Sequence, residues 1–440
     1  MKRLIEEDLV QWKHRTNRKP LLLSGIRQVG KTWTVQAFGR QHYKEMLVVN
    51  FDKESRFADI FRKSKAPSKI IQEFSLLYGK KYKPSETLLF LDEIQSCNEA
   101  LNALKYFSED QEDWHVIAAG SYLGVTLAKG ESFPVGKVDF LELMPMTFPE
   151  FLMAQHQEVL ADWLMTLDRI EPISEPVFDK LKELFREYYI VGGMPEAVQS
   201  WCISKDLVAL EKVQTSILNA YYRDFSKYPP SSVIPRILGV WNSVVGQLSK
   251  DNRKFMFSEI GKGARAREYE TAMDWLVAGG YIHKVKAVEK LDIPLSGYAR
   301  EDHFKILMPD AGLLRMKAEY PASAFSELYD SANVPFKGAL AENLVFQQLR
   351  HAYPGTLYYW ADARHSTDFL LQMGTEVYPV EVKYGENTKS PSLTRLLEQN
   401  PKRVGIRYSM RNLSMDGSIL NIPIPLVCAT FRLLESISDT

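Results

Sequence analysis

The sequence has few cysteines, no net charge and no long apolar stretch. Its three cysteines, Cys97, Cys202 and Cys428, lie far apart, so they predict neither a disulfide framework nor a zinc site and fit a reducing compartment. With 55 basic and 55 acidic residues, the formal charge of +0 gives no general electrostatic reason to bind nucleic acid or a membrane surface. No apolar run approaches the roughly 18 residues of a membrane span, so we expect no membrane partner. The N-terminal residues turn acidic too soon for a signal peptide, which favours a cytoplasmic protein.

What is present is a phosphate-binding motif in an otherwise ordinary globular composition. The pattern Gly25-x-x-x-x-Gly30-Lys31-Thr32 follows an apolar strand-like stretch and precedes a helical one. The two glycines allow a tight curl whose N–H groups point at phosphate oxygens. Lys31 can reach the β- and γ-phosphates, and the Thr32 hydroxyl can ligate Mg²⁺. The alternative, a glycine-rich surface turn, does not explain the preceding strand. The residues expected around the nucleotide are Gly25, Ile26, Arg27, Gln28, Val29, Gly30, Lys31 and Thr32.

Two acids follow a second apolar stretch, residues 88–91. Asp92 and Glu93 would lie at the carboxyl end of a buried parallel strand, where ligands of open α/β sheets bind. Asp92 can hold the Mg²⁺ that Thr32 also touches, and Glu93 can orient and deprotonate the attacking water. Strand ends are often acidic, but the position of this pair after the Gly-Lys-Thr motif favours the catalytic interpretation.

Two more apolar stretches, 46–52 and 115–121, end in polar residues. Together with the first two they predict a doubly wound α/β domain over residues 18–145. Ser121, at the end of the last stretch, is a candidate for positioning water or sensing the γ-phosphate; an equally good reading makes it a helix N-cap. A cation for the transition state could come from Arg27, Lys137 or Arg223, each of which is also readily explained as a surface charge or structural ion pair. The sequence thus supplies the site but leaves the cation open.

Helical patterns dominate the middle of the chain. Those up to about residue 226 look like a helical lid, and residues 236–290 look like a winged helix whose third helix begins near Arg267. The functional interpretation is DNA recognition by that helix. Glu268, Glu270 and Asp274 would repel phosphates, which favours a structural or peptide-binding role instead.

The C-terminal third carries a second group of charged residues. Glu342 lies early in a predicted helix, Asp368 at the head of a strand, and Glu381 and Lys383 on one face of the next strand. Such a group could hold Mg²⁺ through its acids, Asp368 and Glu381 in particular, while Lys383 steadies a hydroxide or the scissile phosphate. That is the chemistry of a metal-dependent nuclease. An exposed strand face that happens to carry a Glu and a Lys is the ordinary alternative.

Taken together, these segments resemble the prokaryotic AAA-superfamily ATPases with a C-terminal domain of unknown function, DUF4143. The matching segments are 24–32, 91–95, 120–121, 143–148, 192–196, 222–224, 341–343, 368–369 and 381–383. The resemblance implies ATP binding with Mg²⁺, ATP hydrolysis, a middle winged helix and a C-terminal domain similar to restriction endonucleases. Family members usually have Gly-Arg where this chain has Gly136-Lys137, and a lysine lacks the bidentate fork of arginine. Many relatives in the wider superfamily form rings, so an oligomer is a candidate state.

We therefore predict an α/β protein in four parts: a P-loop, AAA-like ATPase domain (1–150), a helical lid (151–235), a winged-helix domain (236–330) and a nuclease-like domain (331–440). Three functions compete. The first is an ATPase that drives conformational change on a macromolecular partner. The second is an ATP-gated, metal-dependent DNA nuclease. The third is an ATP-dependent protein-interaction module whose nuclease-like domain is an inert platform.

Overall fold

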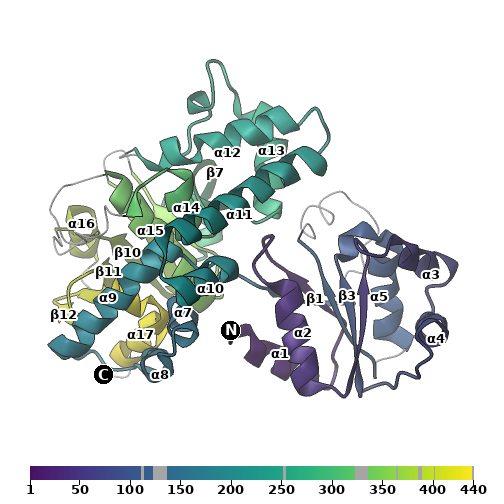
Figure 1. Ribbon diagram of the computed structural model, residues 1–440. Coiled ribbons are helices and arrows are strands. Elements are labelled where there is room, and N and C mark those ends of the chain that lie inside the picture. The colour runs from purple at the N-terminus through teal and green to yellow at the C-terminus, as the bar shows by residue number, and fades with distance from the viewer. Residues whose placement is uncertain are drawn as a thin grey trace. The chain divides into compact units, whose positions relative to one another are not determined.

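Two compact units make up the protein, and each is described by itself. The computed structural model describes residues 1–110, 113–121, 136–250, 254–322, 335–362, 365–384, 389–400 and 402–438. One unit consists of Lys2–Met144 with Ala278–Tyr281, and the other of Pro145–Val277 and Ile282–Thr440 together with Met1 (Figure 1). In the part of the chain that the structure describes, no helix is both long and apolar enough to span a bilayer.

The N-terminal unit is built on a five-stranded, all-parallel sheet in the order β2-β3-β4-β1-β5. The strands are β1 (Leu21–Ser24), β2 (Glu45–Asn50), β3 (Thr87–Asp92), β4 (His115–Ala119) and β5 (Asp139–Glu142). The helices are α1 (Ile5–His14), α2 (Lys31–His42), α3 (Ala58–Lys63), α4 (Pro67–Tyr78) and α5 (Asn98–Asp110), with 3₁₀ turns at Ser55–Phe57 and Ile94–Ser96. Every residue of β3 and β4 is buried, as expected for parallel strands covered on both faces.

Alternation along these strands divides the core between the two faces of the sheet. Leu22, Leu89 and Val116 pack with the apolar side chains of α3, α4 and α5. Figure 1 shows α1 and α2 on the opposite face. The parallel register places Asn50 beside Asp92, so the carboxyl ends of the strands meet at one edge. The α/β class and the parallel-sheet domain predicted from the sequence are thereby confirmed; β5 was not predicted, because it is a short edge strand of partly exposed residues.

The second unit contains an eight-stranded mixed sheet in the order β12-β13-β11-β10-β9-β8-β6-β7. Its strands are β6 (His283–Val288), β7 (Ala299–Leu307), β8 (Tyr358–Trp360), β9 (Phe369–Met373), β10 (Glu376–Val382), β11 (Gly405–Ser409), β12 (Ser414–Asp416) and β13 (Ile419–Pro423). Its helices are α7 (Phe148–Ala154), α8 (Glu158–Thr166), α9 (Glu175–Val191), α10 (Pro195–Ser204), α11 (Leu207–Lys227), α12 (Ile234–Leu248), α13 (Ala266–Ala278), α14 (Ala311–Lys317), α15 (Pro335–Ala352), α16 (Pro391–Gln399) and α17 (Thr430–Ser438). The 3₁₀ turns are Phe257–Glu259, Leu295–Tyr298 and Ile424–Ala429.

The hairpin of β6 and β7 belongs to this C-terminal sheet. β6 pairs antiparallel with β7 and parallel with β8, with Lys286 opposite Tyr358. The wing of the predicted winged helix and the predicted nuclease-like domain therefore share one sheet. The contacts divide the chain near residue 144, and they keep the three parts predicted after residue 150 within one unit. The reason is that the pairing of β6 with β8 joins the predicted winged-helix segment to the predicted nuclease-like segment, which the sequence pattern treats separately.

A buried polar junction explains the Gly192-Gly193 pair. The Asp310 carboxylate accepts hydrogen bonds from the N–H groups of Gly193 (2.6 Å) and Leu313 (2.8 Å). A Cβ on Gly193 would lie 2.1 Å from the carbonyl oxygen of Met146, so only glycine fits there. Burial raises the pKa of Asp310 to about 6 despite these donors. The junction ties the end of α9 to the start of α14 within the second unit.

Candidate functional site

The phosphate-binding loop has the backbone that its sequence predicts. Gly25 (φ 144°), Gln28 (φ 66°) and Gly30 (φ 95°) all have positive φ, and helix α2 starts directly afterwards at Lys31. A Cβ on Gly25 would lie 2.2 Å from the carbonyl oxygen of Leu143, the residue after β5. Glycine is therefore required at this position for both the conformation and the close approach. The loop also directs the N-terminal end of α2, with its free N–H groups, toward the space above the strand ends.

Lys31 is buried and bonded to neutral oxygens. Its Nζ donates to the carbonyls of Gly25 (2.7 Å) and Ile26 (3.2 Å) and to the Ser121 hydroxyl (2.9 Å). Burial lowers the pKa of Lys31 to about 8, and the charges of Glu93 and Asp92 offset only part of that shift. A desolvated cation whose described hydrogen-bond acceptors are all neutral is well placed to receive the phosphates of a nucleotide.

The residues expected to hold Mg²⁺ lie in contact. The Thr32 hydroxyl is 3.1 Å from each carboxylate oxygen of Asp92. Asn50, at the end of β2, donates its side-chain N–H to Asp92 at 2.8 Å. Burial raises the pKa of Asp92, and the hydrogen bonds from Asn50 and Thr32 work in the opposite direction. One hydroxyl and one carboxylate, both hard oxygen donors, fit a magnesium ion that keeps most of its water and also binds phosphate.

Glu93 occupies a constrained position next to this pair. Its backbone has φ 52° and ψ 45°, the left-handed region that a non-glycine residue rarely adopts. Gln95 donates to Glu93 Oε2 at 2.6 Å. Burial is the main cause that raises the pKa of Glu93. A carboxylate with a raised pKa is a better general base than an exposed one, which suits activation of water.

The remaining candidates of this site have mixed outcomes. Ser121 contacts Lys31, as a phosphate-sensing residue should; the alternative N-cap role depends on residues that follow it, which lie outside the described residues. Lys137 pairs with Glu109 at 2.8 Å, so it fills the structural ion-pair alternative. The charge of Arg27 lowers the pKa of Lys31, which places its guanidinium near the loop cation. Arg223 lies exposed on α11 in the other unit.

Asn50 was missed in the sequence. Its signal was present, because it is the polar residue that ends an apolar stretch, in the same way as Asp92 ends the next one. The parallel register then places Asn50 and Asp92 side by side. The polar residues that end neighbouring strands of a doubly wound sheet should therefore be considered together as candidate site residues, and Asn and Gln should be included among them.

In the C-terminal unit each of the four predicted residues contacts another protein group. Lys383 forms an ion pair with Glu381 at 2.6 Å, in keeping with their predicted common face. The Asp368 carboxylate accepts from the backbone N–H of Val382 at 2.7 Å. Glu342, fully buried on α15, pairs with a lysine that the sequence analysis did not consider, Lys305 of β7.

Within the described ranges, no group of three or more His, Cys, Asp or Glu side chains could hold a metal ion. The two acids predicted to bind Mg²⁺ at the C-terminal site, Asp368 and Glu381, each contact a protein group. Lys305 could have been noticed, because a lysine inside the apolar stretch 304–308 cannot reach water from a buried strand without a partner.

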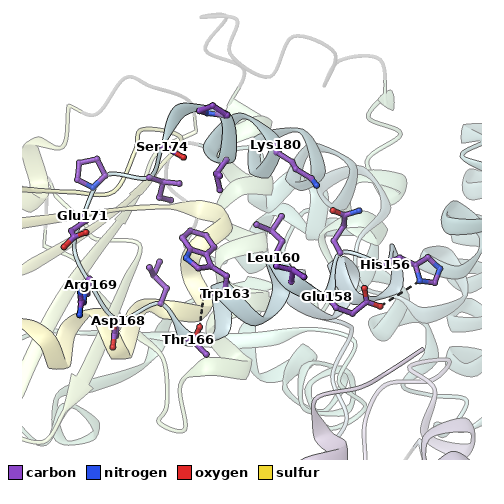
Figure 2. A pocket seen from close by; sticks show the side chains of 17 residues that line it. His156, Glu158, Leu160, Trp163, Thr166, Asp168, Arg169, Glu171, Ser174 and Lys180 are labelled. Atoms are coloured by element: carbon purple, nitrogen blue, oxygen red, sulfur yellow. Dashed lines mark hydrogen bonds and ion pairs between the residues drawn. The ribbon is translucent and has the colours of Figure 1, made fainter.

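A cavity of about 1060 Å³ lies elsewhere in the second unit, along α8 and α9 (Figure 2). Leu160 and Trp163 line its middle, and none of the predicted site residues lies in it. At one end the His156 ring is 3.9 Å from the Glu158 carboxylate. The cavity is therefore separate from both predicted sites.

Comparison with protein families places known domains on this chain. A model described as an AAA domain matches residues 17–152, a domain of unknown function (DUF8612) matches 182–323, and a domain of unknown function (DUF4143) matches 337–427. The N-terminal part of the chain therefore matches an AAA domain and its C-terminal part matches DUF4143, which confirms the resemblance found in the sequence. No curated protein matches the chain.

Solved structures overlap with the chain only in part. A Walker-type ATPase of Pyrococcus abyssi is 15% identical, with a TM-score of 0.45 over 72% of this chain and 95% of that chain. The RuvB Holliday junction branch migration motor of Thermotoga maritima is 16% identical, with a TM-score of 0.30 over 63% and 88%. The ORC1 protein of Aeropyrum pernix, solved in complex with DNA, is 13% identical, with a TM-score of 0.30 over 73% and 91%.

Proposed function

We propose that the protein binds ATP with Mg²⁺ in its N-terminal unit, hydrolyses it, and uses the cycle to change the conformation of a macromolecular partner. The observation that carries this proposal is Lys31, a buried cation whose hydrogen-bond acceptors are all neutral and which lies beside Thr32, Asp92 and Glu93. Such an arrangement fits an incoming polyphosphate better than it fits a structural lysine.

Each residue then has a defined task. The N–H groups of the loop and of the first turn of α2 bind phosphate oxygens, and Lys31 turns from the loop carbonyls to the β- and γ-phosphates. Thr32 and Asp92 hold Mg²⁺, which when bound neutralises charge on the phosphates. Glu93 takes a proton from the attacking water. When Lys31 leaves Ser121, the hydroxyl becomes available to the γ-phosphate, so occupancy of the loop is sensed at the end of β4.

Substitution of Glu93 tests hydrolysis. In the full-length chain Glu93→Gln should lower ATP turnover by roughly 10²- to 10⁴-fold while nucleotide binding is retained, because the amide keeps the shape but cannot accept the proton. Glu86→Gln is the matched control: it removes an acid at the other end of β3, where Glu86 forms an exposed pair with Lys44. Its turnover should equal that of the wild type. A wild-type protein without ATP turnover in any condition, or a Glu93→Gln protein with full turnover, would contradict the proposal.

For the partner we favour a protein over DNA. Helix α13 carries three exposed acids, Glu268, Glu270 and Asp274, and these would repel phosphates. Its inner face is packed, as shown by the ring of Trp275 against that of Phe225 of α11. The same proposal has further parts. This region folds as a winged helix, and residues 151–235 form a helical lid. The protein is cytoplasmic, and an oligomer is its candidate assembly state.

The choice of partner can be measured directly. Fluorescence anisotropy with labelled duplex DNA at low and high salt should show no binding that responds to ATP. Reversal of the acids, Glu268→Lys with Glu270→Lys, should create salt-dependent DNA binding. Tight, salt-dependent binding by the wild type would favour DNA as the partner instead.

A further inference from the structure

The starting point is the misfit between the C-terminal residues and the metal that a nuclease-like site implies. Three carboxylates that share a metal ion must approach it together from several sides. Here Glu342 pairs with Lys305, the Asp368 carboxylate accepts from the Val382 N–H and Glu381 pairs with Lys383, and the described residues contain no group of three or more possible ligands. The question is what takes the place of the cation.

Lys305 is a buried cation in contact with two of the predicted residues. Its side chain is almost completely buried, and its Nζ donates both to the Glu342 carboxylate and to the backbone carbonyl of Asp368. The same ammonium lies 4.8 Å from the ring centroid of Tyr359 and 4.5 Å from that of Phe369. Two oxygen ligands and two aromatic faces surround one positive charge, which is a complete environment for a cation in a water-poor interior.

The other two acids, Asp368 and Glu381, also accept hydrogen bonds from protein groups. Lys383 Nζ contacts Glu381, and the Val382 N–H is directed at Asp368. Counting the two lysines against the three acids, the group carries a net charge of one negative unit, where the sequence prediction with Lys383 alone implied two. An ammonium group has no lone pair and cannot itself be a metal ligand, and its charge repels a second cation nearby.

We infer that Lys305 is the resident cation of the C-terminal domain: its ammonium neutralises Glu342 and binds the backbone carbonyl of Asp368, which supplies internally the positive charge of a divalent ion, and the domain holds no metal at this site. The domain then acts as a folded platform in which Glu342, Asp368 and Lys305 join α15, the head of β9 and β7. This inference concerns the second unit only, and it stands or falls independently of ATP turnover.

Metal counting on the full-length wild type is the first test. With the nucleotide site saturated by ADP, electron paramagnetic resonance of added Mn²⁺ should show the same number of bound ions in the wild type and in Glu381→Gln. Plasmid incubated with Mg²⁺ or Mn²⁺ should be nicked no faster by the wild type than by Asp368→Ala. An extra Mn²⁺ that disappears in Glu381→Gln, or nicking that Asp368→Ala abolishes, would overturn the inference.

Removal of the ammonium is the second test. Lys305→Met should lower the melting temperature by roughly 5–10 °C, and millimolar Mn²⁺ should restore part of that loss because Glu342 then lacks its counterion. Adding Glu342→Leu should abolish the Mn²⁺ effect and recover stability without metal. Lys286→Met is the matched control, since it breaks an exposed pair with Glu301 on the adjacent strand and should change little. If Lys305→Met melts like the wild type, the lysine is not the resident cation. If Lys305→Met does not fold, the wild-type measurements alone decide.

Discussion

Two buried lysines, one in each unit, show opposite uses of the same side chain. Lys31 at the start of α2 donates to two carbonyls and a hydroxyl, all of them neutral, and burial lowers its pKa to about 8. Lys305 in β7 donates to the carboxylate of Glu342, a fully buried acid, and to a backbone carbonyl. The first lysine has a charge that awaits an external anion. The second lysine pairs with an anion inside the protein, so its charge contributes to the structure of the second unit.

The largest expected effect is a difference in the size of the stability loss. Lys305→Met should lower the free energy of unfolding of the second unit by about 3–5 kcal/mol, since it leaves a buried carboxylate without its counterion. Lys31→Met should not lower that of the N-terminal unit by more than about 1 kcal/mol in the absence of nucleotide, because it removes a desolvated charge together with weak neutral hydrogen bonds. Urea unfolding of the two full-length variants measures both. Equal losses would remove the distinction between the two lysines.

Lys31 should also differ from a lysine of the second unit in its effect on ATP turnover. Lys31→Met should lower ATP turnover by roughly 10²- to 10³-fold, the usual consequence of losing one donor to developing phosphate charge. Lys286→Met, which removes a surface lysine from the second unit, should leave turnover at the wild-type level. Steady-state phosphate release measures the effect. Wild-type turnover by Lys31→Met would refute the site.

The lowered pKa of Lys31 makes ATP binding depend on pH. Below pH 8 the lysine is already protonated; above it the free protein loses this proton, and phosphate binding must restore it. ATP affinity should therefore fall as the pH rises above about 8, by up to about tenfold per pH unit. The nucleotide-free unit has the opposite trend: the unfolded chain, with the ordinary pKa of 10.5, binds more protons than the folded one between these values, so stability rises with pH in that window.

Calorimetry in two buffers of different ionisation enthalpy would detect the proton taken up. Lys31→Arg is the control, since arginine stays protonated and should bind ATP without this dependence. A flat affinity between pH 8 and 9.5 in the wild type would show that Lys31 keeps its proton in the free protein, contrary to the effect expected of its burial.

The smallest expected effect belongs to the second C-terminal lysine. Lys383 pairs with Glu381, but its side chain is 28% exposed, against 5% for Lys305. Water already screens this pair, so Lys383→Met should change the free energy of unfolding by at most about 1 kcal/mol. Urea unfolding beside Lys305→Met would show whether burial, and not the presence of an acid, separates the two. A loss as large as that of Lys305→Met would show that it does not.

The N-terminal unit could be read from the sequence in considerable detail. Gly25 and Gly30 have the positive φ values that the motif requires, and Asp92 and Glu93 lie where an apolar strand ends. These features depend on short-range geometry, which neighbouring residues determine. Asn50 and the edge strand β5 were missed, because their places depend on the register between strands.

The C-terminal unit was less predictable, for a physical reason. The pattern at Glu381 and Lys383 correctly indicated a shared face, since alternation along a strand is local. The pairing of Lys305 with Glu342 and with the carbonyl of Asp368 joins three separate segments, and no spacing in the sequence encodes it. A buried ion pair between distant segments forms only where packing brings both charges out of water together.

The sequence alone thus determined the glycine loop, the lysine that follows it and the two acids at the end of β3, because a glycine turn between a strand and a helix is a local structure. Only the tertiary structure decided which lysine is open to a ligand and which is already neutralised. Burial removes both from water, and the charge of the nearest partner, brought from elsewhere in the chain, makes one a binding residue and the other a part of the core.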